Sequence, residues 1–176
     1  MIQQFKYTDK EKEELLKSIV VLVDSREKEN THVTDYFDKK DIPYKKKALS
    51  QGDYSFYLPA NPDLSIPRDL YFDQQMVIER KASLEELSNN FAKERDRFEK
   101  ELSLCKAQMI LLIENASYSD VINGNYKTEY NKKSFLGSLH SFQFKYNLPF
   151  FFMPDNKYSP IFIYATFTYW LRNYIK

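Results

Sequence analysis

Cysteine, glycine and histidine are scarce in this sequence of 176 residues, which contains one Cys, three Gly and two His. The single cysteine, Cys105, excludes an internal disulfide framework and a cysteine cluster for zinc, and it predicts a reducing, cytoplasmic compartment. Long apolar runs are also missing, because the most apolar stretch, residues 160–171, is shorter than the roughly 20 residues that span a bilayer. Residues 1–17 lack the pattern of a secretory signal, so we expect a protein that is not exported. Together with the short apolar stretch, this predicts no membrane partner.

An excess of charge of one sign is missing too, because 26 Lys and Arg balance 25 Asp and Glu to a net charge of +1. A generally basic surface therefore cannot be what binds a polyanion, and any contact with nucleic acid has to be local. Runs of lysine commonly only solvate a surface, but they can also bind backbone phosphates. The candidates for such contacts are Lys45, Lys46, Lys47, Lys127, Lys132 and Lys133.

The apolar content is high, at 43% with 16% aromatic, and it suits one sizeable core, so we expect residues 1–176 to form one domain. Hydrophobic periodicity predicts strands at residues 19–23, 44–49, 53–58, 76–81, 109–113 and 150–153. Helices are predicted from a cap at residue 8 or 9 to 17, and at 31–40, 83–91, 93–106, 132–146 and 159–176, with Ser83 and Glu86 as a capping box.

This order of strands and helices is typical of an α/β domain with helices on both faces of a mixed sheet. Residues 44–49 and 53–58 are predicted to form an antiparallel hairpin around a turn at 50–52, while crossovers through helices give parallel pairs. The last helix carries apolar side chains almost all round. Core packing is its default explanation, and a dimer interface is the alternative.

Polar side chains stand at the ends of otherwise apolar strands. Because side chains alternate along a strand, Glu79 and Lys81 should project from one face and Arg80 from the other. If the strand that begins at Asp53 pairs near Glu79, two carboxylates converge within reach of one hard divalent cation. Such a metal would polarise a phosphate and activate a water, while Lys81 orients that water or offsets developing charge. The set predicts phosphodiester hydrolysis, although Gly-Asp or Glu-x-Lys alone is common in turns and at solvated strand edges.

Three segments together carry a family resemblance. Residues 23–27 (Val-Asp-Ser-Arg-Glu), 52–54 (Gly-Asp-Tyr) and 78–81 (Ile-Glu-Arg-Lys) resemble the signatures of the XPF-type nuclease domain. The active-site pattern of that family is Gly-Asp, a gap, Glu-Arg-Lys, three residues and Asp, and here Glu85 stands at the last position. The resemblance covers about residues 19–153, including a helix motif at 97–102. It implies a restriction-endonuclease-like fold of the PD-(D/E)XK superfamily, three α/β/α layers with a central mixed sheet.

The resemblance also implies roles for individual residues. Catalytic roles fall to Asp24, Glu27, Asp53, Glu79, Arg80 and Lys81, of which Asp24, Asp53 and Glu79 would bind Mg²⁺ or Mn²⁺. Arg26 joins the lysines as a DNA-binding candidate. For Arg26 and Arg80, clamping a neighbouring carboxylate such as Glu27 is an equally weighted alternative. Arg97 and Glu101 share a helix face, and we expect a surface ion pair rather than contact with the active site.

The function implied by the resemblance is a metal-dependent DNA endonuclease, which we expect to select branched, flap or fork DNA by shape in repair or recombination. A Holliday-junction resolvase or restriction-like nuclease of the same fold is one alternative, and a DNA-binding module without catalysis is another. The sequence shows neither the helix-hairpin-helix nor the helicase module that many relatives carry. A compact form of this kind implies, by resemblance, the cytoplasm of a bacterium or of a phage-infected cell. Because nuclease domains of this family commonly dimerise, a homodimer through the last helix is the alternative to core packing.

Overall fold

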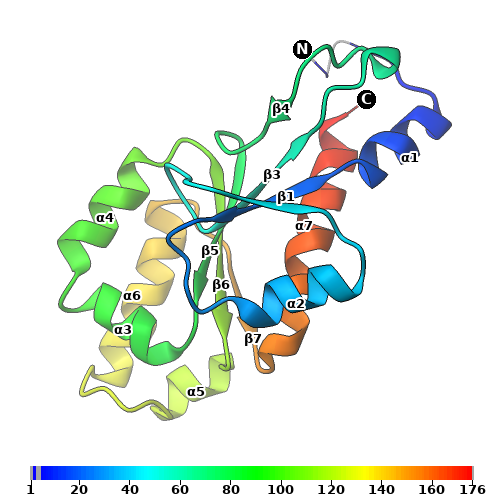
Figure 1. Cartoon of the computed structure of the whole chain (residues 1–176). Coiled ribbons are helices and arrows are strands. Elements are labelled where there is room, and N and C mark those ends of the chain that lie inside the picture. The colour runs from blue at the N-terminus through cyan, green and yellow to red at the C-terminus, as the bar shows by residue number, and fades with distance from the viewer. Residues whose placement is uncertain (1, 3–4, 176) are drawn as a thin grey trace.

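The structure, a computed structural model, describes residues 2 and 5–175 (Figure 1). The N-terminal half contains α1 (Asp9–Lys17), β1 (Val20–Asp24), α2 (Thr31–Lys39), β2 (Tyr44–Lys47), β3 (Tyr54–Leu58), β4 (Leu70–Tyr71) and β5 (Met76–Lys81). The C-terminal half contains α3 (Leu84–Phe91), α4 (Arg95–Leu104), β6 (Gln108–Glu114), α5 (Tyr118–Asn123), α6 (Lys132–Lys145), β7 (Phe150–Met153) and α7 (Ser159–Tyr174). The bounds predicted for residues 76–81 and 150–153 are confirmed, whereas β4 and α5 were not predicted.

The strands form one mixed sheet in the order β2-β1-β3-β5-β6-β7, with the short β4 paired to β3. β5, β6 and β7 run parallel, β1 and β2 run parallel, and β3 is antiparallel to both β1 and β5. In Figure 1, α2 and α7 lie on one side of this sheet, and α3, α4 and α6 lie on the other. The predicted α/β/α architecture with a central mixed sheet is therefore confirmed.

The predicted hairpin between residues 44–49 and 53–58 is wrong. β2 pairs with β1 in parallel, from Val21 opposite Tyr44 to Asp24 opposite Lys47, and β3 pairs with the other edge of β1. β1 is almost wholly apolar and buried, so it is stable at an interior position with a partner on each side. The lysine-rich β2 suits a sheet edge. As a consequence the chain between β2 and β3 passes the C-terminal end of β1, where the Asp24 N–H donates to the Asp53 carbonyl at 2.8 Å.

Each face of the sheet has its own hydrophobic core. One core joins β1, β3 and β5 to α2 and α7, and it includes Val23, Tyr54, Phe56 and Ile78. The other joins β5 and β6 to α3, α4 and α6. Val77 belongs to the second core and Ile78 to the first, so the alternation along β5 continues towards Glu79 and Lys81 on the α3–α4 face and Arg80 on the α2 face.

Helix ends in the described chain follow local capping chemistry. Thr8 and Glu11 form a complete capping box at α1. At α3 the predicted box is wrong in one half: the Ser83 hydroxyl accepts the Glu86 N–H at 3.4 Å, but the Glu86 carboxylate accepts the Ala82 N–H at 2.8 Å. This contact turns the Glu86 side chain back towards the end of β5.

The last helix packs chiefly by its inner side. Ile163, Phe167 and Leu171 of α7 are buried in the core, which supports the core interpretation, whereas Ile161 and Tyr169 are exposed. Lys176, the predicted end of this helix, lies outside the described residues. Within the described ranges, every helix is too short or too polar to cross a membrane.

Candidate active site

Asp53 is held beside Glu79 by the backbone of β5. The turn before it uses Gly52 in a left-handed conformation, with φ of 68°, and a Cβ added at Gly52 would lie 2.8 Å from the Val77 Cβ. The Asp53 N–H donates to the Ile78 carbonyl at 2.9 Å, and the Asp53 Oδ2 accepts the Arg80 N–H at 2.7 Å. Two hydrogen bonds to the backbone of β5 therefore hold Asp53 beside Glu79.

The ionisation of Asp53 is perturbed by its surroundings. Burial and the nearby charge of Glu79 raise the pKa of Asp53 well above its usual range, against the lowering by the Arg80 N–H. Lys81 reduces this excess of negative charge, because its Nζ lies 2.7 Å from the Glu79 Oε1 and 3.6 Å from the Glu86 Oε1. Burial opposes the charged form of Lys81, but Glu79 and Glu86 outweigh it and raise the pKa of Lys81. Lys81 is therefore an ammonium at neutral pH.

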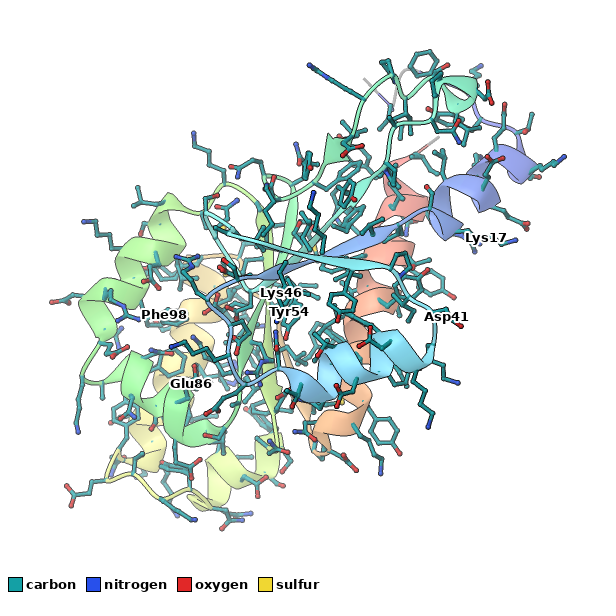
Figure 2. All side chains as sticks on the ribbon, in the orientation of Figure 1. Lys17, Asp41, Lys46, Tyr54, Glu86 and Phe98 are labelled. Atoms are coloured by element: carbon teal, nitrogen blue, oxygen red, sulfur yellow. The ribbon has the colours of Figure 1, made fainter. Side chains whose placement is uncertain are left out.

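This group opens into a cavity of about 440 Å³ between the strand ends and α4. Asp24, Arg26, Glu27, Asp53 and Glu79 line one side, and Arg97, Phe98, Glu101, Leu102 and Leu104 line the side of α4. Figure 2 labels Phe98 on α4 and Glu86 on α3, the two helices that flank the end of β5. The Lys81 Nζ lies 5.3 Å from the centre of the Phe98 ring, so α4 also covers the ammonium.

The donor set suits a hard divalent cation with several water ligands. Each carboxylate keeps one oxygen, Asp53 Oδ1 and Glu79 Oε2, without a hydrogen-bond donor in the described part of the chain. Residues 2 and 5–175 contain no group of three or more His, Cys, Asp or Glu placed to hold a metal ion. Magnesium commonly binds through one or two carboxylates and retains water, whereas zinc requires three or four protein ligands. Asp53 and Glu79 thus fit magnesium or manganese.

Asp24 lines the same cavity, but its carboxylate already forms an ion pair with Arg26. The Arg26 backbone N–H donates to its Oδ1 at 2.9 Å, and the Arg26 Nη2 lies 2.5 Å from its Oδ2. Burial raises the pKa of Asp24, but the hydrogen bonds from Arg26 outweigh it, and the net effect lowers that pKa. Arg26 also donates to the Leu49 carbonyl at 2.6 Å. The clamping alternative for Arg26 has direct support here, and metal binding by Asp24 stays a prediction.

Arg80 points away from the cavity into the other face of the sheet. Its Nη1 donates to the Glu114 Oε2 at 2.6 Å, and its Nη2 donates to the Glu27 Oε1 at 2.9 Å and to the Glu29 carbonyl at 3.0 Å. Burial disfavours the charge on Arg80, but Glu114 and Glu27 raise its pKa overall. The guanidinium thereby ties β5 to β6 and to the segment after β1. This geometry favours the structural alternative for Arg80, and the catalytic roles of Arg80 and Glu27 stay predictions.

Arg80 with Glu27, Glu114 and His32 forms a largely buried cluster that we call the clamp. Glu114 and His32 were not identified from the sequence. Glu114 is fully buried at the end of β6, and its second oxygen lies 2.8 Å from the His32 Nε2 at the start of α2. The available signal was an acid directly after the apolar run at residues 109–113. A buried carboxylate at such a place requires a cationic partner.

The predicted DNA-binding lysines form two separate groups. Lys45 and Lys46 are exposed on β2, and Lys46 is labelled in Figure 2, but the Lys47 Nζ is paired with Asp73 at 2.7 Å and lies over the Tyr71 ring. The second group, Lys132 and Lys133, begins α6 and does not line the cavity beside Asp53. Of the predicted DNA-binding residues, only Arg26 lines that cavity.

Two further predictions about charged residues can be compared with the structure. Arg97 and Glu101 form an exposed ion pair at 3.2 Å, as expected, yet both also line the cavity. Glu85, at the last position of the family pattern, accepts the Lys127 N–H at 2.9 Å, which lowers the pKa of Glu85. This carboxylate fastens the segment before α6 and does not line the cavity.

Comparisons with known proteins agree with this geometry. The sequence model of the ERCC4 domain family matches residues 23–166. Among solved structures, XPF from Aeropyrum pernix is similar at 16% identity with a TM-score of 0.62, over 87% of this chain and 65% of that one. XPF from Aeropyrum pernix in complex with DNA is similar at 17% identity with a TM-score of 0.61, over 88% of this chain and 65% of that one.

These structural matches show only that the fold is shared, because the sequence identity is low and the chain spans 65% of the length of the proteins it matches. A search of curated proteins gives no match. The predicted resemblance to the XPF-type nuclease domain is nevertheless confirmed, and the sequence match extends it from residue 153 to residue 166, inside α7.

Proposed function

The chain belongs to the ERCC4 domain family, and we propose that it is a divalent-metal-dependent DNA endonuclease that hydrolyses phosphodiester bonds. One observation carries the proposal: Asp53 is fixed by backbone hydrogen bonds next to Glu79, with the Lys81 ammonium 2.7 Å from Glu79, at the wall of an open cavity. Two adjacent carboxylates with one buried ammonium suit the hydrolysis of a charged ester better than the core of a passive binding module.

In this proposal Asp53 and Glu79 would hold the ion through their free oxygens. When bound, Mg²⁺ or Mn²⁺ would polarise the scissile phosphate as a Lewis acid and lower the pKa of a water. Lys81 remains charged and would orient the attacking water or offset the developing charge on the phosphate. Phe98 and Leu102 of α4 exclude bulk water from one side of the cavity, which strengthens these electrostatic contacts.

DNA is the proposed substrate. The structure of XPF from Aeropyrum pernix in complex with DNA has the same fold, which supports the proposal. Arg26 at the cavity lip, with Lys45 and Lys46 on the adjacent edge strand, offers cationic contacts for a backbone near the acids. These proposed contacts come from a strand and a loop and reach the DNA backbone, which carries no sequence information. We therefore propose that the protein selects branched, flap or fork DNA by shape, in repair or recombination.

Cleavage assays separate this proposal from its alternatives. Linear, flap, fork and four-way DNA are incubated with Mg²⁺, Mn²⁺ or chelator, and we expect metal-dependent cuts near the branch of flap or fork DNA. Preferred cutting of four-way DNA would favour a junction resolvase, and sequence-fixed cuts in linear DNA would favour a restriction-like enzyme. Binding without any cleavage would favour the remaining alternative, a DNA-binding module without catalysis.

Point variants identify the chemistry. Glu79→Gln and Lys81→Met should each lower the cleavage rate about 100-fold or more, because each removes a charge that acts on the reacting phosphate. Lys100→Met, on the exposed side of α4, is the matched control and should cleave normally. Circular dichroism and thermal unfolding check that the variants are folded. Wild-type rates in a folded Lys81→Met variant would refute the assignment.

Oligomerisation and location complete the proposal. We propose a homodimer through α7, whose outer side exposes Ile161 and Tyr169, and a cytoplasmic protein of a bacterium or a phage-infected cell. Sedimentation at micromolar concentration tests the dimer: a monodisperse monomer removes it.

A further inference from the structure

A second cavity, of about 460 Å³, adjoins the catalytic one at the C-terminal end of α4. Leu102, Cys105 and Met109 line both cavities, so the two adjoin at these side chains, and we call the surface that runs along both of them the groove. The groove begins at Asp53 and Glu79, passes the last turn of α4, and ends between Lys106, Tyr146 and Asn147. Each cavity is the size of a small-ligand site, so the groove suits a chain of single nucleotides.

The lip of the catalytic cavity, next to the residues that the two cavities share, carries an apolar side chain that packs against little protein. Leu104 is the last residue of α4, lines the catalytic cavity and is 67% exposed. Leu102 and Met109 below it are buried. An exposed leucine next to catalytic acids offers an apolar surface at the place where the substrate enters, and an unstacked base has a flat apolar face that fits such a surface.

The far end of the groove is cationic. Lys106 is the one charged residue among those that line the second cavity, and its side chain is exposed. Unlike Lys47 and Lys145, it forms no ion pair within residues 2 and 5–175. The Lys106 N–H donates to the Gln51 Oε1 at 3.1 Å, and Gln51 directly precedes the Gly52-Asp53 turn. The backbone that carries this cation is thereby linked to the turn before Asp53.

Tyr146 and Asn147 add an aromatic ring and an amide at the same end. The Tyr146 hydroxyl donates to the Glu99 Oε2 at 2.9 Å, which holds the ring at the wall of the second cavity. An apolar floor, a fixed aromatic ring and an unpaired cation are together the chemistry that binds an unpaired nucleic acid strand: bases pack on the apolar surfaces and a phosphate contacts the cation.

We propose that this groove binds the unpaired segment of DNA next to the scissile phosphate, with Leu104 against a base and Lys106 against a phosphate. This rests on the proposed function and adds to it the position and identity of the subsite for the unpaired arm. A base-paired arm does not use the groove, because its bases are stacked inside the duplex and present only their edges.

The test measures binding without cleavage. Fluorescence anisotropy in chelator gives the Kd of the whole protein for a labelled oligothymidine and for a blunt duplex of equal length. Leu104→Ala and Lys106→Ala should each raise the Kd for oligothymidine about fivefold or more and leave the duplex Kd unchanged. Lys106→Ala should also reduce the slope of log Kd against log salt concentration for oligothymidine by about one, the value for one lost phosphate contact.

Matched controls are Phe144→Ala, which removes an apolar side chain that is 81% exposed on α6, and Lys100→Ala on α4. Both should bind both probes as the wild type does. The proposal is overturned if wild-type protein does not bind oligothymidine, if Leu104→Ala and Lys106→Ala bind it normally, or if they lose both probes equally. A protein that binds through the groove but cleaves no DNA with Mg²⁺ or Mn²⁺ would overturn the proposed nuclease activity and leave the groove standing.

Discussion

Replacing Arg80 with Met should unfold this protein at much lower temperature. The substitution keeps an elongated apolar side chain but leaves Glu27 and Glu114 without their shared cation, and the exposed fractions of these side chains are only 15% and 1%. Removing one partner of a buried ion pair costs about 3–5 kcal/mol, because the remaining charge stays buried and uncompensated. Such a loss lowers the melting temperature of a domain of this size by about 6–20 °C.

Thermal and urea unfolding measure this loss, with Arg97→Met as the control. The ion pairs of Arg97 with Glu94 and Glu101 are exposed, so the control should lose less than about 1 kcal/mol. The double variant Arg80→Met with Glu114→Gln should recover part of the loss, because the buried carboxylate is then neutral. An Arg80→Met variant as stable as Arg97→Met would refute the clamp.

Three other outcomes follow from the same geometry. Asp53→Asn should stabilise the metal-free protein and abolish its stabilisation by Mg²⁺ or Mn²⁺ in thermal unfolding. Because the pKa of Asp53 is raised, the folded protein binds a proton at this carboxyl more tightly than the unfolded chain does. Wild-type stability therefore falls as pH rises from below about 4 through the folded pKa. The stability gain of Asp53→Asn over the wild type should grow over the same pH range. Gly52→Ala should lower the free energy of unfolding, measured in urea, by more than about 1 kcal/mol and slow cleavage, because a left-handed residue gains a Cβ 2.8 Å from the Val77 Cβ. Lys47→Ala, which breaks a half-exposed pair with Asp73, should change the free energy of unfolding by about 1 kcal/mol or less.

The elements were predictable where the signal is local. The strand at residues 76–81 follows from an apolar run that ends in charged residues, and its bounds agree with β5. The pairing of residues 44–47 was not local: a short turn suggested a hairpin, but the burial of β1 on both sides required two neighbours and separated β2 from β3. β4 has two residues and no periodicity to detect.

The site divides in the same way. Asp53, Glu79 and Lys81 were found because the alternation of one strand and the start of another decide where these side chains lie. Glu114 and His32 were not found, because they approach Arg80 from β6 and α2, and only the packing of the sheet against α2 brings them there. Gln51 was treated as an ordinary turn residue, yet it joins the turn before Asp53 to the Lys106 backbone.

The sequence Glu79-Arg80-Lys81 performs two tasks because adjacent residues of a strand face opposite sides. Glu79 lines the cavity with Lys81 paired to it, and Arg80 anchors the strand from the opposite face while its own N–H holds Asp53. The clamp on one face therefore sets the position of a carboxylate on the other. An Arg80→Lys substitution keeps the charge but cannot reach Glu27 and Glu114 with a planar fork, so it should impair cleavage even if the variant remains folded.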